Sequence, residues 1–296
     1  MRKKGAGIQA GKAPIITLTL FILVTYYVVF LLYPIGRVIY GSFFNWNPLI
    51  GSMIYIGLDN YIAAMNNSLF WESIRNTLVF TISATLIRTP LGLFLAIILF
   101  NIKRFRTFFR LAYFMPFITS TIAVAVVWSL MYDPRIGVFN MILQFFGLPG
   151  QMWLRSEALA LPSVIAMAIW KHTGFVVILY LSGLASIPRE CIEAAQIDGA
   201  SKWNVFRLIT IPLLKPTTLV VVVMSIITYM KVFTEIFVMT GGGPVNATTT
   251  MVYHIYVESF VYFRFGYASA VSVLLLVLVL VVALAQFKII RTDWSY

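Results

Sequence analysis

The chain has 296 residues, of which 60% are hydrophobic and 11% are charged, and its formal net charge is +12. A soluble domain of this length could not bury so much apolar surface, and several apolar runs approach the ~20 residues that a membrane-spanning helix needs. The single cysteine, Cys191, excludes an internal disulfide framework and a multi-cysteine metal site, and two widely separated histidines argue against a zinc site. The composition therefore indicates a membrane protein.

Six apolar segments predict an all-α fold with six transmembrane helices. The first segment follows basic residues, as in a cleaved signal peptide, but it is too long, and Tyr33, Pro34 and Arg37 stand where such a peptide needs small residues. We therefore expect an N-terminal segment over 1–14 and a first span that is retained. The predicted spans cover 15–35, 74–100, 111–132, 158–187, 217–240 and 266–287, and the last five form a core over 74–296.

The basic residues outside these spans are divided unequally between alternate sides. Fourteen lie in the N-terminal segment, the 101–110 loop, the 188–216 loop and the tail, and five lie on the opposite side, counting Arg75 at the start of the second span. Loops rich in Lys and Arg stay in the cytoplasm, so both termini and the 188–216 loop are predicted to be cytoplasmic. The net charge is mainly an orientation signal, and we expect no nucleic-acid partner.

The stretch EAAQIDGASKWNVFRLITIP, residues 193–212, is more polar than its surroundings. Pro188 suits the first turn of a helix, and Glu193 is favourable near the positive end of its dipole. Ala194 and Ala195 are strong helix formers whose small side chains allow another surface to approach. This first short helix is either a docking surface for another protein or a solvated connection between two spans.

A second short helix is predicted to follow the first. Gly199 tolerates the positive φ of a helix C-terminal cap, and Ser201 can cap a helix that carries Trp203 and Phe206. Pro212 then precedes the next span. The sequence thus predicts a helix–turn–helix elbow at the cytoplasmic face.

The elbow resembles the signature loop of ATP-binding-cassette (ABC) importer permeases. The matching positions are Glu193-Ala194-Ala195, Gly199 and Ile209-x-Ile211-Pro212, with Ile211 where Leu is commoner. The resemblance implies a type I ABC importer permease fold whose cytoplasmic coupling helix docks on a separate ATPase subunit. It assigns coupling to Glu193, Ala194, Ala195, Asp198, Gly199 and Ala200.

Four further segments resemble the carbohydrate branch of these importers, in particular the maltose-type first permease subunit. They are IGLDNYIAAMNNSLFWESIRNTLVFT (56–81), YDPRIGVFN (132–140), IWKHTGF (169–175) and TGGGP (240–244). The chain departs from the maltose permease in lacking extra N-terminal spans and a large extracytoplasmic insertion, because its 36–73 loop is too short. The resemblance implies a sugar substrate, a homologous second permease, two copies of an ATPase subunit and an extracytoplasmic solute-binding protein, in a cell membrane whose lipid surrounds the spans.

The chain itself is not expected to be an enzyme. It has no G-x-x-x-x-G-K-[ST] phosphate loop, and TGGGP lacks the lysine and reads as a turn. ATP and Mg²⁺ are therefore expected on the partner ATPase subunits, with no cofactor in this chain.

Charged residues deep in a span usually face a cavity or a partner. Arg88, Lys171, Lys231 and Glu235 are such residues, although Lys231 and Glu235 could neutralise one another at i, i+4 spacing and Arg88 could satisfy helix-terminal carbonyls. In the maltose-type relatives, sugar contacts come from the regions that correspond to 171–175 and 225–232. The candidate pathway residues are Lys171, His172, Phe175, Ser225, Thr228, Tyr229, Lys231, Phe233 and Glu235.

Three alternatives remain open at this stage. Cationic residues outnumber anionic ones in the spans, which suits an anionic saccharide or a glycerol phosphate. An ion-coupled secondary transporter would need a protonatable residue near the midplane, and only Glu235 is available there. A membrane-embedded enzyme would need paired carboxylates, a metal cluster or a nucleophile with its base, none of which the spans contain.

Overall fold

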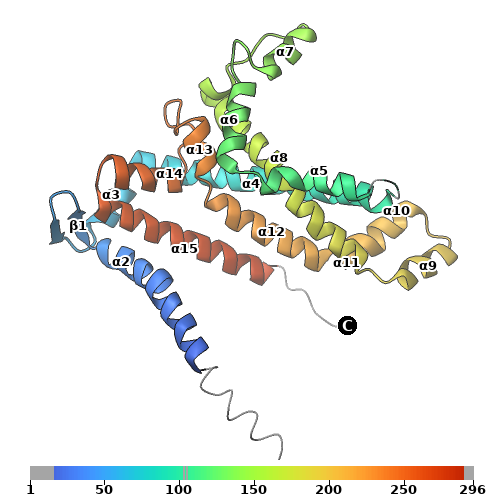
Figure 1. Cartoon of the computed structure of the whole chain (residues 1–296), viewed down its shortest axis with the longest axis horizontal. Helices are drawn as coiled ribbons and strands as arrows, with labels where there is room; N and C mark the ends of the chain where they lie inside the picture. The colour runs from blue at the N-terminus through green and yellow to red at the C-terminus, as the bar shows by residue number, and fades with distance from the viewer. Residues whose placement is uncertain (1–16, 103, 105, 290–296) are drawn as a thin grey trace, which may run out of the picture. The chain divides into compact units, whose positions relative to one another are not determined.

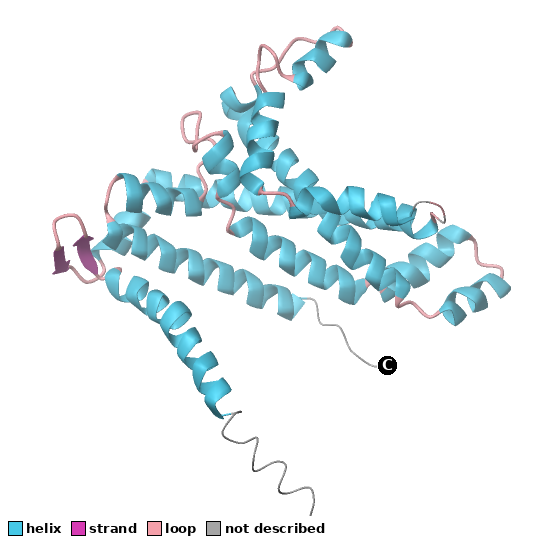
Figure 2. Cartoon of the chain, viewed as in Figure 1, coloured by secondary structure: helices cyan, strands magenta, loops and turns pink. Residues whose placement is uncertain are grey.

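The computed structural model describes residues 17–102, 104 and 106–289, so the predicted N-terminal segment 1–14 lies outside the described residues. These residues form helices and one two-stranded antiparallel hairpin (Figure 2). The strands are β1 (Phe44–Asn47) and β2 (Ser52–Tyr55), and η2 (Trp153–Arg155) is a single 3₁₀ turn. The π-helical turns are η1 (Val28–Leu32), η3 (Phe206–Thr210) and η4 (Val257–Val261). The α-helices are α2 (Tyr33–Gly41), α3 (Asp59–Met65), α4 (Ser68–Asn101), α5 (Arg106–Ile118), α6 (Thr121–Met131), α7 (Val138–Phe145), α8 (Glu157–Ala185), α9 (Arg189–Ile197), α10 (Lys202–Val205), α11 (Ile211–Leu213), α12 (Lys215–Met230), α13 (Thr234–Met239), α14 (Met251–Tyr256) and α15 (Phe265–Ile289).

Four helices are long and apolar enough to cross a membrane: Thr17–Gly41, Ser68–Asn101, Glu157–Ala185 and Phe265–Gln286. Two bent pairs raise the number of spans to as many as six if each pair is one span. The pair of α5 and α6 bends by 95°, and the pair formed by residues Lys202–Leu213 and Lys215–Met230 bends by 61°. The sequence predicts spans over 111–132 and 217–240. The range 111–132 contains the bend between α5 and α6, and the range 217–240 extends past the end of α12 at Met230.

The chain divides into two compact units, Met1–Asn66 with Ile255–Leu274 and Asn67–His254 with Leu275–Tyr296. In the first unit, the hairpin is tied to the chain on either side of it. Asn60 Nδ2 donates hydrogen bonds to the carbonyl oxygens of Ser42 (2.8 Å) and Phe44 (2.9 Å). Trp46 packs edge-on against Phe265, with ring centroids 5.4 Å apart. These contacts join α3 and the start of α15 to the hairpin.

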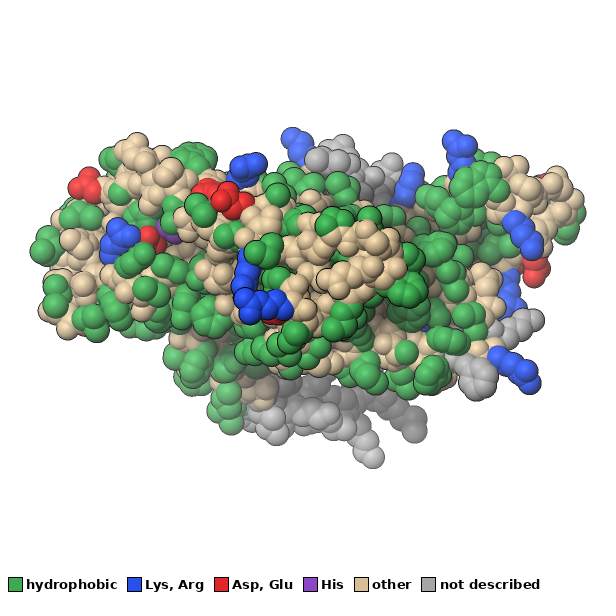
Figure 3. Space-filling model, turned by 90° about the horizontal axis from the view of Figure 1, so that it is seen from above, with side chains coloured by type: hydrophobic (Ala, Val, Ile, Leu, Met, Phe, Trp, Pro, Cys, Tyr) green, Lys and Arg blue, Asp and Glu red, His purple; other side chains and the backbone are tan. Residues whose placement is uncertain are grey.

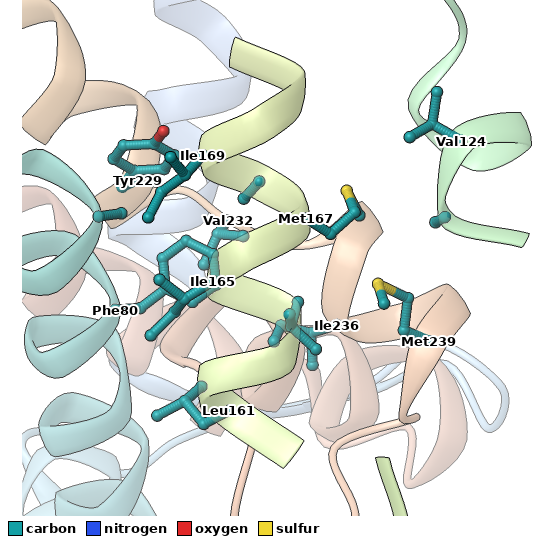
Figure 4. Close-up of a cluster of buried hydrophobic side chains, with 14 of the residues drawn as sticks. Phe80, Val124, Leu161, Ile165, Met167, Ile169, Tyr229, Val232, Ile236 and Met239 are labelled. Carbon is teal, nitrogen blue, oxygen red and sulfur yellow. The ribbon is translucent and has the colours of Figure 1, made fainter. Parts of the chain in front are cut away.

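In the second unit, α4, α5, α8 and α12 form a bundle, and α8 packs against the other three (Figure 1). One apolar cluster fills the space between α4, α8 and the 229–239 segment. Figure 4 shows Phe80 of α4 facing Ile165 of α8, with Tyr229 and Val232 beside the same helix. Hydrophobic side chains also dominate the surface that Figure 3 displays. A buried apolar core beneath an apolar surface is what a lipid-embedded bundle requires.

The 132–153 loop after α6 is held by one buried amide. Asn140 Nδ2 donates to the carbonyl oxygens of Pro134 and Gln151, both at 3.0 Å. Its Oδ1 accepts from the backbone N–H of Gln151 (2.9 Å) and from Nε1 of Trp153 (2.8 Å). Four hydrogen bonds satisfy the buried amide completely, so they hold the loop in one conformation without a disulfide.

Candidate functional site

The signature stretch folds as two helices joined by a tight turn. The first helix is α9, and it ends in a Schellman motif: Ala200 N–H donates to the carbonyl of Ala195 (2.9 Å) and Gly199 N–H to that of Gln196 (3.1 Å). Gly199 has φ +80°, a conformation in which an L side chain is strained. The predicted positive φ is therefore confirmed.

The second helix of the elbow starts where the sequence predicts. Ser201 is the N-cap of α10, and its hydroxyl accepts a hydrogen bond from the backbone N–H of Asn204 (3.3 Å). The helix then continues through η3 and α11 to Leu213, and Pro212 lies in its last turn, before α12 begins at Lys215. Pro188 is the N-cap of α9 and not its first helical residue.

The α9 helix is largely exposed, although its Ile192 side chain packs against an apolar cluster of the same chain. None of its residues is buried, and Ile197 is 86% exposed. Glu193, Ala194, Asp198 and Gly199 are exposed, and Ala195 and Ala200 are half-buried. Figure 1 shows α9 beyond the end of the α4–α5–α8–α12 bundle. A helix of nine residues is marginal alone, so this exposed face is suited to contact with another molecule.

Lys171, predicted as a pathway residue, secures the break between α5 and α6. It is 2% exposed, and its ammonium group donates to the carbonyls of Pro116 (3.2 Å), Phe117 (3.3 Å) and Thr119 (2.8 Å). The last carbonyls of a helix have no intrahelical partner, and a cation there is favourable. This geometry favours a structural role for Lys171 over direct contact with a transported solute.

Other candidate residues do come together in the bundle. Arg88 of α4 lies with its guanidinium carbon 5.4 Å from the centre of the Tyr229 ring, and the rings of Tyr229 and His172 are 5.8 Å apart. His172 Nε2 lies 3.9 Å from Oε1 of Glu235. We call Arg88, His172, Tyr229 and Glu235 the Arg88 cluster. The hypothesis that Arg88 satisfies helix-terminal carbonyls is wrong for its Nε and Nη1, which have no hydrogen-bond partner.

The proposed i, i+4 pairing of Lys231 with Glu235 is also wrong. Lys231 is the C-cap of α12, with φ −107° and ψ 19°, so no continuous helix joins the two residues. The Lys231 side chain is exposed, whereas Glu235 is buried beside His172. Phe233, between them, stacks on Phe237 with ring centroids 5.4 Å apart.

The remaining pathway candidates are dispersed. Phe175 stacks on Phe117, with centroids 5.0 Å apart, and so adjoins the break between α5 and α6. Ser225 is buried and donates to the carbonyl of Val221 (2.6 Å). Thr228 is exposed and donates to the carbonyl of Met224 (2.7 Å). The two hydroxyls are thus satisfied within their own helix.

Two of the segments singled out from sequence, 132–140 and 240–244, line one cavity of about 440 Å³. Asp133 and Arg155 provide its charged side chains, and Gly243 and Pro244 line another part of it. The pKa of Asp133 lies below its ordinary value because the backbone N–H groups of Arg135 and Ile136 donate to its carboxylate. Sequence reasoning does not predict that these segments meet, since no local pattern links them.

The break in the third span also escapes prediction, although its signal is present in the sequence. Pro116 lies inside α5, and the run Thr119-Ser120-Thr121 follows it. Proline removes a helical hydrogen bond, and hydroxyl side chains favour the start of a new helix.

Known proteins resemble this chain in both sequence and fold. Residues 88–291 match the family model described as "Binding-protein-dependent transport system inner membrane component". A probable ABC transporter permease of Pyrococcus horikoshii is 38% identical over 79% of this chain and 80% of its own length. The trehalose/maltose transport system permease protein MalF of Thermococcus litoralis is 36% identical over 77% of this chain and 78% of its own length.

The fold matches over nearly the whole chain. A chain of the bacterial alginate ABC transporter, solved in complex with an alginate pentasaccharide-bound periplasmic protein, superposes with a TM-score of 0.84. The two chains are 25% identical, and the match covers 96% of each. The chain therefore belongs to the family of binding-protein-dependent transport system inner membrane components, the permease subunits of ABC importers.

Proposed function

We propose that this chain is the permease half of an ATP-driven, binding-protein-dependent importer for a sugar or oligosaccharide. The observation that carries the proposal is the exposed, Schellman-capped α9 helix, whose Glu-Ala-Ala and Gly positions match the signature loop. Glu193, Ala194, Ala195, Asp198, Gly199 and Ala200 would dock on the ATPase. The named substrates of the trehalose/maltose and alginate systems support a saccharide.

The proposed assembly contains this chain, a homologous second permease, two ATPase subunits and an extracytoplasmic solute-binding protein. ATP and Mg²⁺ would bind only to the ATPase subunits. The relative solved with a periplasmic protein supports the last partner. One permease provides half of the translocation pathway. We propose that the Arg88 cluster and the neighbouring aromatic residues line this half.

Reconstitution tests this function directly. In proteoliposomes, the complete assembly should accumulate a saccharide in the presence of ATP and the loaded binding protein, whereas this permease without its ATPase should transport nothing. The measurement is uptake of radiolabelled saccharides from a panel of neutral and acidic compounds. Uptake by the permease alone would disprove the ATP-driven assignment, and the absence of saccharide uptake by the full assembly would disprove the substrate class.

We also propose that both chain termini and α9 lie in the cytoplasm. The unequal division of basic residues between the loops supports this orientation. In a Cys191→Ser background, cysteines at Ile50 and Val245 should react with a membrane-impermeant maleimide in intact spheroplasts. A cysteine at Asn101 should react only after permeabilisation. Labelling of Asn101→Cys in intact spheroplasts would show that the orientation is the opposite of the one proposed.

A further inference from the structure

The polar face of α4 changes character along its length. Toward its beginning, Asn76 Nδ2 donates to the carbonyls of Asn246 (3.2 Å) and Thr249 (3.1 Å), and the Thr77 hydroxyl accepts from the Met251 N–H (2.9 Å). Further along, the buried hydroxyls of Thr81 and Thr85 have no hydrogen-bond partner. These residues recur at helical spacing, so they lie on one face of α4. That face leads to Arg88.

Arg88 is a buried cation whose hydrogen-bonding environment is incomplete. Its side chain is 3% exposed, its Nε and Nη1 have no hydrogen-bond partner, and it forms no ion pair among the described residues. The Arg88 guanidinium carbon lies 5.4 Å from the centre of the Tyr229 ring, and the Tyr229 hydroxyl and His172 Nδ1 are buried without a hydrogen-bond partner. Buried guanidinium N–H groups without an acceptor are costly, because removing a charge from water must be offset by a partner.

The charged neighbours of Arg88 do not supply that partner. Glu235 is the buried carboxylate of the cluster, and its Oε1 lies 3.9 Å from His172 Nε2 rather than pairing with Arg88. The Lys171 ammonium is occupied by the three carbonyls at the end of α5. The cluster therefore combines an uncompensated cation with unpartnered ring and hydroxyl groups, all within one subunit.

We infer that Arg88, with Tyr229 and His172 beside it, forms a specificity site for an oxyanion group, a carboxylate or a phosphate, carried by the transported solute. A guanidinium presents paired N–H donors in a plane that matches such a group, and Nε and Nη1 are two of those donors. This inference rests on the proposed function and narrows its substrate to acidic saccharides or sugar phosphates. Contact with the solute would complete the polar environment that the chain alone leaves open.

The test uses the complete transporter in nanodiscs without its binding protein, so that the specificity of the binding protein does not decide which probe reaches the permease. The probes are digalacturonate, glycerol 3-phosphate and neutral digalactose, and binding is measured by calorimetry. We expect one anionic probe to bind the wild type and digalactose not to bind. The probe that binds distinguishes a carboxylate from a phosphate.

Arg88→Gln should weaken binding of that probe about tenfold or more, the usual range for loss of a hydrogen bond to a charged group. Arg88→Lys keeps the charge but not the planar pair of donors, so its affinity for that probe should lie between those of the wild type and Arg88→Gln. Arg75→Gln is the matched control, because Arg75 lies on the same helix with an exposed side chain.

Two results would overturn the inference. One is equal binding of the anionic probe by the wild type and Arg88→Gln. The other is binding of digalactose, but of neither anion, by the wild type, a result that does not depend on the folding of any variant. Uptake of neutral saccharides by the full assembly would then still support the proposed function. The absence of any saccharide uptake would disprove the proposed function itself.

Discussion

Replacing Gly199 with Asp should give a folded, membrane-inserted permease that no longer retains its ATPase subunit. The residue has φ +80°, and an ideal Cβ there would meet no atom within 4 Å. The difficulty for a side chain is therefore backbone strain of about 1 kcal/mol or more and not a clash. We expect this strain to loosen the two hydrogen bonds that close the turn and so to change the direction of α9. Aspartate would add a negative charge beside Asp198 at the proposed docking face.

Co-purification of the ATPase and its stimulation by the loaded binding protein measure this effect. We expect both to fall at least tenfold with Gly199→Asp, which is equivalent to about 1.4 kcal/mol. Gly199→Asn should be milder, since asparagine has nearly the same shape as aspartate and also tolerates the left-handed region but adds no charge beside Asp198. Gly147→Ala is the matched strain control: Gly147 has φ +71° and also has no atom within 4 Å of an added Cβ. Wild-type ATPase retention by Gly199→Asp would remove the coupling role from this loop.

What can be predicted from the sequence depends on how local the determining interactions are. The Gly199 cap and the Ser201 cap each depend on residues within a few positions, so the elbow is predictable almost residue by residue. Four helices long and apolar enough to cross a membrane are also predictable, because length and hydropathy are properties of the local sequence. The bend between α5 and α6 is not, because Lys171 and the carbonyl of Pro116 that it binds are 55 residues apart.

The errors in the candidate site have the same origin. Pairing of Lys231 with Glu235 assumes a continuous helix, but the helix ends at Met230. Arg88 and Lys171 look equivalent in sequence, as isolated cations within apolar spans. The structure distinguishes them, because Lys171 meets three carbonyls and Arg88 Nε and Nη1 meet none. Only the tertiary contacts separate a structural cation from one that is free to bind a ligand.

Gly174→Ala should disrupt the permease more severely than the same change at Gly36 or Gly147. A Cβ on Gly174 would overlap the carbonyl oxygen of Tyr113 and lie 2.9 Å from its carbonyl carbon and 3.1 Å from the Phe114 Cα. These are backbone atoms of α5, so no side-chain rotation can relieve the overlap. The whole of α5 would have to move away from α8, at a cost of about 1–3 kcal/mol or more for overpacking. Its displaced carbonyls would also lose their contact with Lys171.

Hydrogen exchange and uptake together measure this displacement. In Gly174→Ala, we expect faster exchange over residues 106–121 and at least a tenfold loss of transport, with α9 and its ATPase contact preserved. Lys171→Met should reproduce the exchange change, because it removes the other element that holds the end of α5. Gly36→Ala, in α2, is the control, since an added Cβ there has no atom within 4 Å. If Gly174→Ala transported normally while Lys171→Met did not, the close approach of α5 to α8 would be dispensable, and the ammonium contacts alone would hold the break in the third span.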